Sequence, residues 1–584
     1  MNDKVLVFVT LASLALVACG DGSEAGDSGM DAVPDGAADA TTDAAPVACT
    51  ADGECDDGRF CNGVETCAAE ACVAGSSPCG AGESCNEAEA RCEAIGPPGD
   101  GMPLGIPSPS FDCTPEGPLE PTLFVDGDDA DCDDAGPGTA DAPLCSLFRD
   151  GRSGTYEAGE VVHVLGGPYA VDGDYTLTMN GTEASPVYIV GRGAERVRYD
   201  GGGERADFEW AGSHGCVEHL DFFHMTRHQI AGDHLGLRDV AVHNPADSFI
   251  NFNPVVSVTG HDVLIAESEI FNNRRMSDTD SHGIQASEGS FNVWILDNEL
   301  YNNNGDSFQA CHRCFGAPPH HIYLGRNIMH DDRENGIDLK TVHDVVISEN
   351  TLYGYGSSGT SNGDAMVIGS NGFDDATNQG PRRVWVLHNE FRDSGTGVRV
   401  EGSEDVWLIG NVIQDVGVGV QIDDKSHRSI VVAANTLQGI GAGDGVSVFG
   451  CQPTALVLVD NIVFDVAERH LDMGACDAAA LSVTNNLFAN SDGSFAVRAD
   501  GTQHTDIASL EGETFAMDNV AQDPEFEGTT QVPAAGSPAV DGGASLESYY
   551  SAFLAAFGAD IAIDRAGTAR PSGESEDIGA YERP

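Results

Sequence analysis

A chain of 584 residues is longer than one ordinary hydrophobic core supports, so several domains or a repeat array are expected. Its 72 glycines and its 7% of aromatic residues favour many turns and short strands over long helices. With 28 Lys and Arg against 94 Asp and Glu, the net charge of −66 excludes nucleic acid and anionic lipid as direct partners. The same charge repels acidic polysaccharides unless a cation such as Ca²⁺ bridges them.

The first element along the chain is an apolar run at residues 5–18, VLVFVTLASLALVA, which is too short to span a bilayer comfortably. It ends in the phrase LVACG, which resembles the cleavage site of a bacterial lipoprotein signal. The resemblance implies that residues 1–19 are the signal, that Cys19 carries the lipid, and that the protein is anchored to the outer membrane. A simple secretory signal, giving a secreted extracellular protein, is the alternative, because Lys4 is offset by Asp3.

Residues 20–48 are small and acidic and have no hydrophobic period, so they predict a disordered tether. Residues 49–93 then hold eight cysteines and almost no large apolar residues, which predicts a disulfide-rich module. The cysteines are Cys49, Cys55, Cys61, Cys67, Cys72, Cys79, Cys85 and Cys92. Zinc is the rival explanation, but CxxC pairs are absent and no His lies inside the module. The phrase CDDGRFCNGVETC resembles Cys-rich modules in large surface proteins of myxobacteria-like bacteria, and residues 94–117 follow as a Pro/Gly linker.

The remainder repeats one phrase, seen as NVWILDNELY, HIYLGRNIMH, DVVISENTLY and RVWVLHNEFR. A polar anchor recurs near the end of each phrase at spacings of 30, 29, 23, 39, 22, 24, 26 and 25. The anchors are Ser268, Asn298, Asn327, Asn350, Asn389, Asn411, Asn435, Asn461 and Asn486. A second short strand follows most anchors, so each unit is two or three alternating strands joined by Gly, Asn and Asp turns. No unit could bury its apolar face alone, so the units must stack.

This pattern resembles right-handed parallel β-helices, the pectate-lyase-like solenoids of bacterial surface proteins. The implied fold class is all-β, with the β-helix over residues 118–545 and a C-terminal tail over residues 546–584 that ends in DIGAYE. The anchor residues would face inward and form a ladder of amide hydrogen bonds between coils. Helical repeats are the competing architecture, but the apolar period is two and Gly-rich turns interrupt it.

Two disulfides are predicted in this part of the chain. Cys451 and Cys476 each precede a coil strand by the same five residues, so stacking places them within disulfide range. The stretch around Cys132 and Cys145 resembles the entry of bacterial β-helix proteins, and that resemblance implies that these two cysteines are paired.

The candidate catalytic residue is Lys340, in the strand GIDLK. Ile337 and Leu339 point inward, so Asp338 and Lys340 face out. The stretch resembles the lysine coil of alginate and chondroitin lyases, in which a Lys or Arg base removes the proton beside a carboxylate that a cation neutralises. The phrase GVRVEGSEDVWLIGN resembles another piece of those enzymes and exposes Arg399 and Glu401.

In register, the outward column runs through Gln285, Gln309, Asp338, Arg399 and Gln421, which predicts a polar strip for sugar hydroxyls and a Ca²⁺ ion. The departure from the lyases is that the coil after Lys340, DAMVIGSNG, has no basic residue. Asp338 would also raise the pKa of the lysine. The alternative is that Lys340 is an ordinary solvated side chain paired with Asp338.

The sequence contains three further groups of candidate site residues. Asp306, Asp338 and Asp364 lie beside the same column and offer the paired carboxylates of a glycosidase, although Asp is also a common turn residue. The stretch CHRCFGAPPHH holds Cys311, His312, Cys314, His320 and His321, which are zinc-ligand types. Oxidation of its cysteines, to each other or to Cys216, is the alternative in an oxidising compartment. The histidines at positions 214, 219, 224, 228, 234 and 243 receive no role.

The sequence therefore predicts a monomeric surface or extracellular β-helix protein whose partner is a polysaccharide or cell-surface glycan. Catalysis is undecided; Ca²⁺-dependent lyase-type cleavage ranks ahead of hydrolysis, with Lys340, Arg399 and Asp338 as catalytic residues. Gln285, Gln309, Glu401 and Gln421 are the predicted sugar-binding residues. The competing hypothesis is a non-catalytic adhesive or structural protein in which the solenoid is a rigid spacer.

Overall fold

The computed structural model describes residues 101–583 with short gaps, and four strands between residues 66 and 94. The gaps are residues 112, 114–118, 204–205, 245–253, 274–279, 312–315, 359–360, 370–379, 424–426, 450–452, 475 and 529. The signal, Cys19 and the tether lie outside the described residues. The chain divides into two units, residues 1–76 and 77–584. In the described part of the chain, no helix has the length and apolarity needed to cross a membrane.

Four short strands fall in the predicted Cys-rich module: β1 (Thr66–Ala68), β2 (Ala71–Val73), β3 (Glu83–Asn86) and β4 (Arg91–Ala94). β1 pairs with β2, and β3 with β4, each antiparallel. Cys67 is disulfide-bonded, as the module requires.

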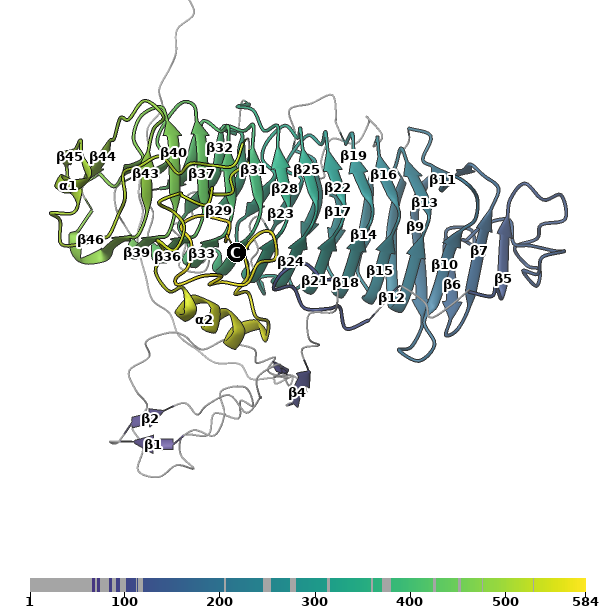
Figure 1. The fold of residues 1–584 in the computed structure, drawn as a ribbon. Helices are drawn as coiled ribbons and strands as arrows, with labels where there is room; N and C mark the ends of the chain where they lie inside the picture. Colours follow the sequence, from purple (N-terminus) through teal and green to yellow (C-terminus); the bar gives the residue numbers. More distant parts are fainter. Residues whose placement is uncertain are drawn as a thin grey trace, which may run out of the picture. The chain divides into compact units, whose positions relative to one another are not determined.

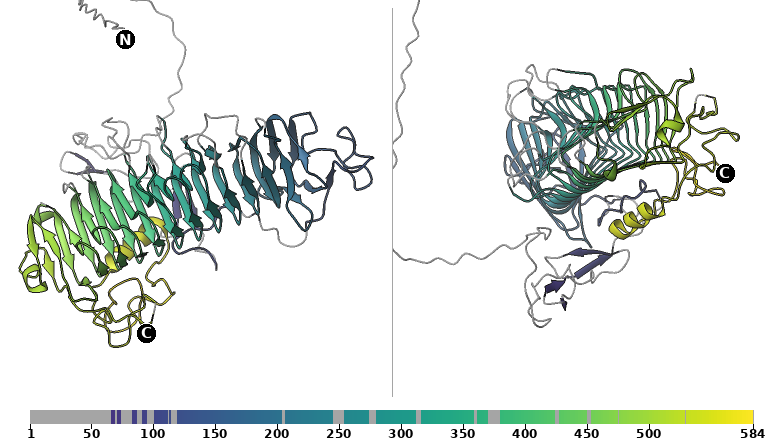
Figure 2. Two further views of the ribbon diagram at one scale, coloured as in Figure 1. Left: turned by 90° about the horizontal axis from the view of Figure 1, so that it is seen from above. Right: turned by 90° about the vertical axis from the view of Figure 1, so that its left-hand side faces the viewer.

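The main body is a right-handed parallel β-helix whose coils stack three long parallel sheets (Figure 1). We call them sheets I, II and III. β12 (Ala206–Glu218) is long enough to belong to both sheet I and sheet II. Seen along the axis of the solenoid, successive coils follow the same path (right-hand view of Figure 2).

Sheet I contains β6 (Ser153–Glu157), β9 (Gly173–Asn180), β14 (Arg227–Ile230), β17 (Pro254–Val258), β20 (His282–Ala286), β23 (Phe308–Ala310), β26 (Ile337–Leu339), β29 (Asp364–Gly369), β32 (Thr396–Glu401), β35 (Val418–Ile422), β38 (Val446–Val448), β41 (Leu471–Asp472) and β44 (Val497–Ala499), with β45 (Thr502–His504) antiparallel at its end. Sheet II contains β5 (Leu123–Asp126), β7 (Val161–Leu165), β10 (Val187–Gly191), β15 (Asp233–Arg238), β18 (His261–Ala266), β21 (Phe291–Leu296), β24 (His320–Gly325), β27 (His343–Ser348), β30 (Arg382–Leu387), β33 (Glu404–Ile409), β36 (His427–Ala433), β39 (Pro453–Val459), β42 (Leu481–Thr484) and β46 (Ala516–Met517).

Sheet III contains β8 (Tyr169–Ala170), β11 (Val197–Asp200), β13 (Leu220–Phe223), β16 (Ala241–His243), β19 (Glu269–Phe271), β22 (Glu299–Tyr301), β25 (Ile328–His330), β28 (Thr351–Tyr353), β31 (Glu390–Arg392), β34 (Val412–Gln414), β37 (Thr436–Ile440), β40 (Ile462–Val466) and β43 (Leu487–Ala489). The helical elements are a 3-10 turn (Ala478–Ala480), α1 (Ile507–Leu510) and α2 (Glu547–Phe557). The last coil strand is β46, so the solenoid ends before the predicted boundary at residue 545.

The predicted asparagine ladder is confirmed. Each anchor lies in the turn between sheets II and III. Nδ2 of each asparagine anchor donates to Oδ1 of the next one, as from Asn298 to Asn327 at 3.0 Å, whereas at Ser268 the backbone N–H donates to Oδ1 of Asn298 at 2.9 Å. The residue before each anchor adopts the left-handed conformation, for example Glu349 at φ 58° before Asn350. The ladder continues one step beyond the predicted set, because Asn486 Nδ2 donates to Oδ1 of Asn519 at 3.0 Å. All these asparagines are buried, so the ladder satisfies polar groups inside the solenoid.

Residues 102–111 together with Cys113, part of the predicted Pro/Gly linker, are a strap that packs against the outer face of sheet II. Leu104 and Ile106 are buried in an apolar cluster with Trp294, whose Nε1 donates to the carbonyl oxygen of Pro107 at 2.8 Å. A Cβ on Gly325 would lie 2.4 Å from the ring of Pro103, so glycine permits this close approach. This part of the predicted linker is thus packed, because the apolar residues of the strap cover apolar side chains on the outer face of sheet II.

The C-terminal tail covers the same face. Tyr550, Phe553 and Phe557 of α2 join the apolar cluster of sheet II, and α2 lies along this flank in Figures 1 and 2. The strap and the C-terminal helix α2 thus cover one flank of the solenoid.

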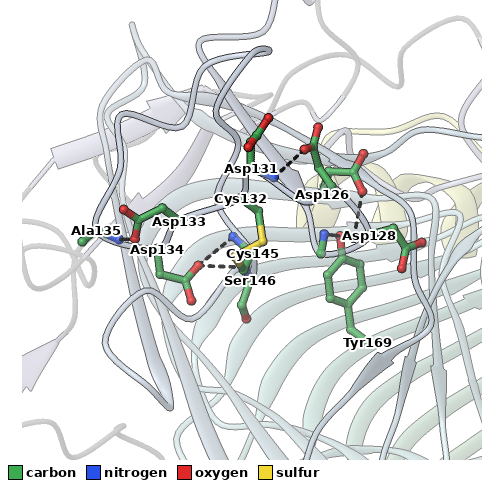
Figure 3. Close-up of a disulfide and its surroundings, with 12 residues drawn as sticks. Asp126, Asp128, Asp131, Cys132, Asp133, Asp134, Ala135, Cys145, Ser146 and Tyr169 are labelled. Carbon is green, nitrogen blue, oxygen red and sulfur yellow. Dashed lines mark hydrogen bonds between the residues drawn. A yellow bond between two sulfur atoms is a disulfide. The ribbon is translucent and has the colours of Figure 1, made fainter.

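Two disulfides are described completely. Cys132 and Cys145 are bonded, as predicted, among the aspartates of the entry loop (Figure 3). Cys113 of the strap is bonded to Cys216 across 103 residues. Cys476 is also disulfide-bonded, but its predicted partner Cys451 lies outside the described residues.

Candidate functional site

The predicted polar column lies on the outer face of sheet I. Strand pairing aligns Gln285 with Gln309, and Gln309 with Asp338. The next coil contributes Val367, which aligns with Asp338 on one side and with Arg399 on the other. Arg399 then aligns with Gln421. We call Gln285, Gln309, Asp338, Lys340, Arg399, Glu401 and Gln421 the polar strip.

The centre of the polar strip is recessed rather than solvated. Gln309 is 5% exposed and Asp338 is 4% exposed, and the side chain of Lys340 is 14% exposed. The alternative described Lys340 as a solvated side chain paired with Asp338. The pairing is present, but the side chain is mostly buried rather than solvated. A side chain that points out of a coil reaches water only where no neighbouring segment covers it, and strand alternation alone cannot reveal such cover.

Asp338 and Lys340 form a buried ion pair. Oδ2 of Asp338 lies 2.7 Å from Nζ of Lys340, whereas Oδ1 has no hydrogen-bond partner among the described residues. Burial raises the pKa of Asp338 to about 7, against the opposing effect of Lys340. Burial acts to lower the pKa of Lys340, but the carboxylates of Asp338, Asp306 and Glu401 outweigh it and raise that pKa. The lysine is thus held protonated, which is unfavourable for a general base.

The second cation of the strip is also held by carboxylates. Nε of Arg399 lies 2.8 Å from Oδ2 of Asp364, and a second guanidinium nitrogen contacts Glu401. Asp364 and Glu401 are both buried, and burial raises the pKa of Asp364. Neither Lys340 nor Arg399 is therefore available to a substrate carboxylate without first leaving a partner.

A third cluster lies beside the strip, at the start of the strands of sheet I. The described residues contain one group of metal-ligating types whose ligand atoms lie within 4.8 Å of one another: His282, Asp306 and Glu334, all buried. Oδ1 of Asp306 accepts from the backbone N–H and Nδ2 of Asn335, at 3.1 and 2.9 Å. Oδ2 accepts from Nε2 of Gln309 at 3.1 Å, which links the cluster to the strip.

Charge is shared within this cluster. Nδ1 of His282 lies 3.1 Å from Oδ2 of Asp306. Burial acts to lower the pKa of His282, but Asp306 outweighs it and raises that pKa. Burial acts to raise the pKa of Asp306, and His282 outweighs it and lowers that pKa. Of this cluster, only Asp306 was a predicted site residue. His282 begins the short strand HGIQAS, and no motif in the sequence pointed to Glu334.

The cluster does not fit the predicted Ca²⁺ ion well. Ca²⁺ takes six to eight oxygen ligands, whereas this group supplies one imidazole and two carboxylates, and Asp306 already accepts several hydrogen bonds. No described residue of the polar strip adds a further ligand to the group.

The alternative zinc set around Cys311 is not formed as predicted. Cys311 is disulfide-bonded, so it offers no thiolate, and Cys216 is bonded to Cys113. His312 and Cys314 lie outside the described residues. His320 and His321 bring their Nδ1 atoms to 2.7 Å, and burial lowers the pKa of both rings. Together they form a neutral histidine pair.

The early histidines occupy structural positions. His214, His219, His224 and His234 have positive φ; His214 and His234 lie within β12 and β15, and His219 and His224 lie between strands. His228 is fully buried, and burial lowers its pKa to about 3. The ring of His243 stacks on that of Phe271 and so belongs to a row of stacked rings on sheet III. Its Nε2 also lies 2.8 Å from Oδ1 of Asp221.

The comparisons with known proteins concern the solenoid. A family model for right-handed β-helix regions matches residues 320–507. A comparison with curated proteins finds no match. Three solved structures are similar over most of their length. Pectate lyase Pel9A is 15% identical with a TM-score of 0.40, and the match covers 80% of this chain and 97% of that one.

The second structure is the A-module of mannuronan C-5 epimerase AlgE4 from Azotobacter vinelandii. It is 14% identical with a TM-score of 0.39, and the match covers 64% of this chain and 91% of that one. The third, a mutant tailspike protein of E. coli bacteriophage HK620, is 11% identical with a TM-score of 0.42, covering 68% and 80%. The strand pairing described above establishes the architecture, and none of these likenesses bears on the chemistry of the strip.

Proposed function

We propose that the protein binds a polysaccharide outside the cell along the polar strip and cleaves a glycosidic bond there, with Asp338 as the general acid. The observation that carries the proposal is the state of Asp338. Its carboxyl is buried and keeps one oxygen without a partner among the described residues. Burial raises its pKa to about 7, so it can hold a proton near neutral pH.

The neighbours of Asp338 suit a polyhydroxylated ligand. Nε2 of Gln285 donates to Oε1 of Gln309 at 2.8 Å, so the two amides form a row beside Asp338. Gln421 continues the polar row beyond Arg399. Amide groups donate and accept hydrogen bonds, as sugar hydroxyls do, and consecutive coils repeat every ~4.8 Å along the strip.

The same geometry favours hydrolysis over lyase chemistry, which reverses the order expected from the sequence. A lyase must neutralise the substrate carboxylate and needs a base of low pKa. Here Lys340 has a raised pKa, and both cations of the strip already face carboxylates. Arg399 pairs with Asp364 and Glu401, so these two carboxyl groups are the candidates for the second carboxylate that glycoside hydrolysis needs. A neutral glycan therefore fits the strip better than a polyuronate.

The disulfide between Cys113 and Cys216 supports an oxidising, extracytoplasmic location, since such bonds persist outside the cytosol. Attachment to the outer membrane through a lipid on Cys19 is part of the same proposal. Its test is the mass of the mature N-terminus and its loss in Cys19→Ala.

The test of function uses the mature protein on panels of neutral polysaccharides and polyuronates, with and without Ca²⁺. New reducing ends without ultraviolet absorbance of unsaturated product are expected on a neutral glycan. The expected activity falls as pH rises through about 7, because the general acid then loses its proton. Asp338→Asn should lower turnover by about 100-fold or more. The control is Asp172→Asn, which alters an exposed ion pair with Arg152 and should leave the turnover unchanged.

Unsaturated product lost in Lys340→Ala would establish the lyase alternative in place of hydrolysis. Binding without turnover would leave a lectin-like role and contradict the assignment of Asp338. An absence of binding across both panels would contradict the whole proposal and favour the rigid-spacer hypothesis.

A further inference from the structure

We infer that His282, Asp306 and Glu334 form a binding site for a divalent transition-metal ion such as Mn²⁺ or Zn²⁺. The three side chains come from three consecutive coils, and each presents a ligand atom within 4.8 Å of the others. All three are buried, with exposures of 2%, 0% and 7%. One imidazole with two carboxylates is a ligand set that suits Mn²⁺ and Zn²⁺, whereas Ca²⁺ and Mg²⁺ are held by oxygen atoms.

The charges around the site are compatible with a bound divalent cation. Asp280 is paired with Arg333, and Asp338 with Lys340, so both of these neighbouring carboxyl groups already face a cation. Asp306 and Glu334 both face His282; Arg333 also contacts Glu334 at 3.4 Å, and the charge of Lys340 acts on Asp306. Two buried carboxylates and a neutral imidazole balance a divalent ion, whereas a protonated histidine balances only one of the carboxylates.

The ligands are held in place by a surrounding shell. Asn335 donates twice to Oδ1 of Asp306, and Gln309 donates to Oδ2. A Cβ on Gly305 would lie 2.5 Å from Nδ1 of His282, so only glycine lets the backbone approach the ring this closely. Directly before His282, the hydroxyl of Ser281 is buried and has no hydrogen-bond partner among the described residues. Such support of ligands by their neighbours is typical of metal centres.

The site is separate from the proposed catalytic acid. It is connected to the polar strip by the hydrogen bond that Gln309 donates to Asp306. An ion bound to Asp306 would therefore hold the side chain of Gln309 in place. The metal site does not depend on the identity of the glycan, or on whether one binds.

The experiment measures binding of Mn²⁺ and of Zn²⁺ to the chelator-treated full chain by calorimetry, with Ca²⁺ as the comparison ion. One equivalent of Mn²⁺ or Zn²⁺ is expected to bind, and Glu334→Gln and His282→Gln should each weaken binding by about 10-fold or more. The matched control is Glu299→Gln, because Glu299 and Asp331 flank His330 in a more exposed group of the same residue types. This variant should bind like the wild type.

Pulsed EPR of bound Mn²⁺ should show coupling to one imidazole nitrogen, and this measurement needs no variant that could misfold. Absence of binding, absence of the nitrogen coupling, or equal affinity in Glu334→Gln and the wild type would each overturn the inference. Failure of the glycan assays would leave these results intact, so the two proposals fail separately.

Discussion

Nζ of Lys340 and Oδ2 of Asp338 lie 2.7 Å apart, two residues along the chain, on a face of the solenoid that is closed to most solvent. In the proposed function, this pair sets the protonation of the general acid. The lysine stays charged because several carboxylates face it, and the carboxyl keeps a pKa near 7 because it is buried. The residue that resembles a lyase base is therefore a partner that positions Asp338.

Removing the lysine should destabilise the fold. Lys340→Met leaves the buried Asp338 without its cation, and at pH 8, where Asp338 is mostly charged in the wild type, we expect a loss of about 3 kcal/mol in the free energy of unfolding. The double variant Asp338→Asn with Lys340→Met should recover part of that loss, because no buried charge then lacks a partner. Urea denaturation of the four proteins in a double-mutant cycle measures the coupling. Additive effects would show that the two groups do not interact in solution.

The inner ladder predicts a second effect on stability. Nδ2 of Asn350 donates to the carbonyl oxygen of Leu324 and to Oδ1 of Asn389, each at 2.9 Å. Its own Oδ1 accepts from the backbone N–H and Nδ2 of Asn327. Asn350→Ala leaves buried donors and an acceptor without partners, so we expect a loss of about 2–4 kcal/mol.

The control for the ladder is Asn180→Ala. Asn180 is exposed and makes a single side-chain contact with Glu157 at 3.3 Å, so its loss should be within about 0.5 kcal/mol. An equally small effect of Asn350→Ala would mean that water or rearranged coils replace the ladder bonds.

The ladder and the alignment of the polar column could be predicted from the sequence, because both follow from the repeat. Once Asn327 and Asn350 mark the same turn of successive coils, counting along the strands aligns Gln309 with Asp338. The burial of Asp338 could not be predicted, because strand alternation shows that the side chain points outward but not how far its neighbours cover it. Glu334 was missed because its position depends on a turn rather than on a strand.

The strap was missed for a different reason. Its apolar residues are few and lie among prolines and glycines, so their local pattern indicates a linker. Ile106 is buried because sheet II presents Trp294 and Tyr323 on its outer face, far away in the sequence. No local pattern records that contact.

The strap should contribute to stability through its disulfide. The bond between Cys113 and Cys216 closes a loop of 103 residues, whereas Cys132–Cys145 spans 13. Cys113→Ser with Cys216→Ser should cost roughly 4 kcal/mol, and Cys132→Ser with Cys145→Ser roughly 3 kcal/mol, because the longer loop loses more entropy when it is closed. Thermal unfolding of both variants without reductant checks the order. A smaller loss for the 113–216 pair would indicate that the strap stays docked through its apolar residues alone.

The C-terminal tail introduces a pH dependence through Asp460, a fully buried residue of the turn after β39. Oδ1 of Asp460 accepts from the backbone N–H of Ala544 at 2.8 Å, and Oδ2 has no partner among the described residues. Burial raises the pKa of Asp460 to about 8, and Glu576 adds to the effect. Below about pH 4 the carboxyl is protonated in both folded and unfolded chains, and above about pH 8 it is charged in both.

Between these limits the folded chain binds more protons than the unfolded chain, so this group lowers stability as pH rises from about 4 to about 8. Asp460→Asn keeps the acceptor for Ala544 and removes the charge. We expect it to be more stable than the wild type by on the order of 2 kcal/mol at pH 8, with no gain at pH 4. Asp415→Asn is the control, since Asp415 has the same left-handed conformation but is exposed. Urea denaturation at pH 4 and pH 8 measures the free energy of unfolding of each protein. An equal gain in stability at both pH values would show that the effect comes from packing rather than from the ionisation of Asp460.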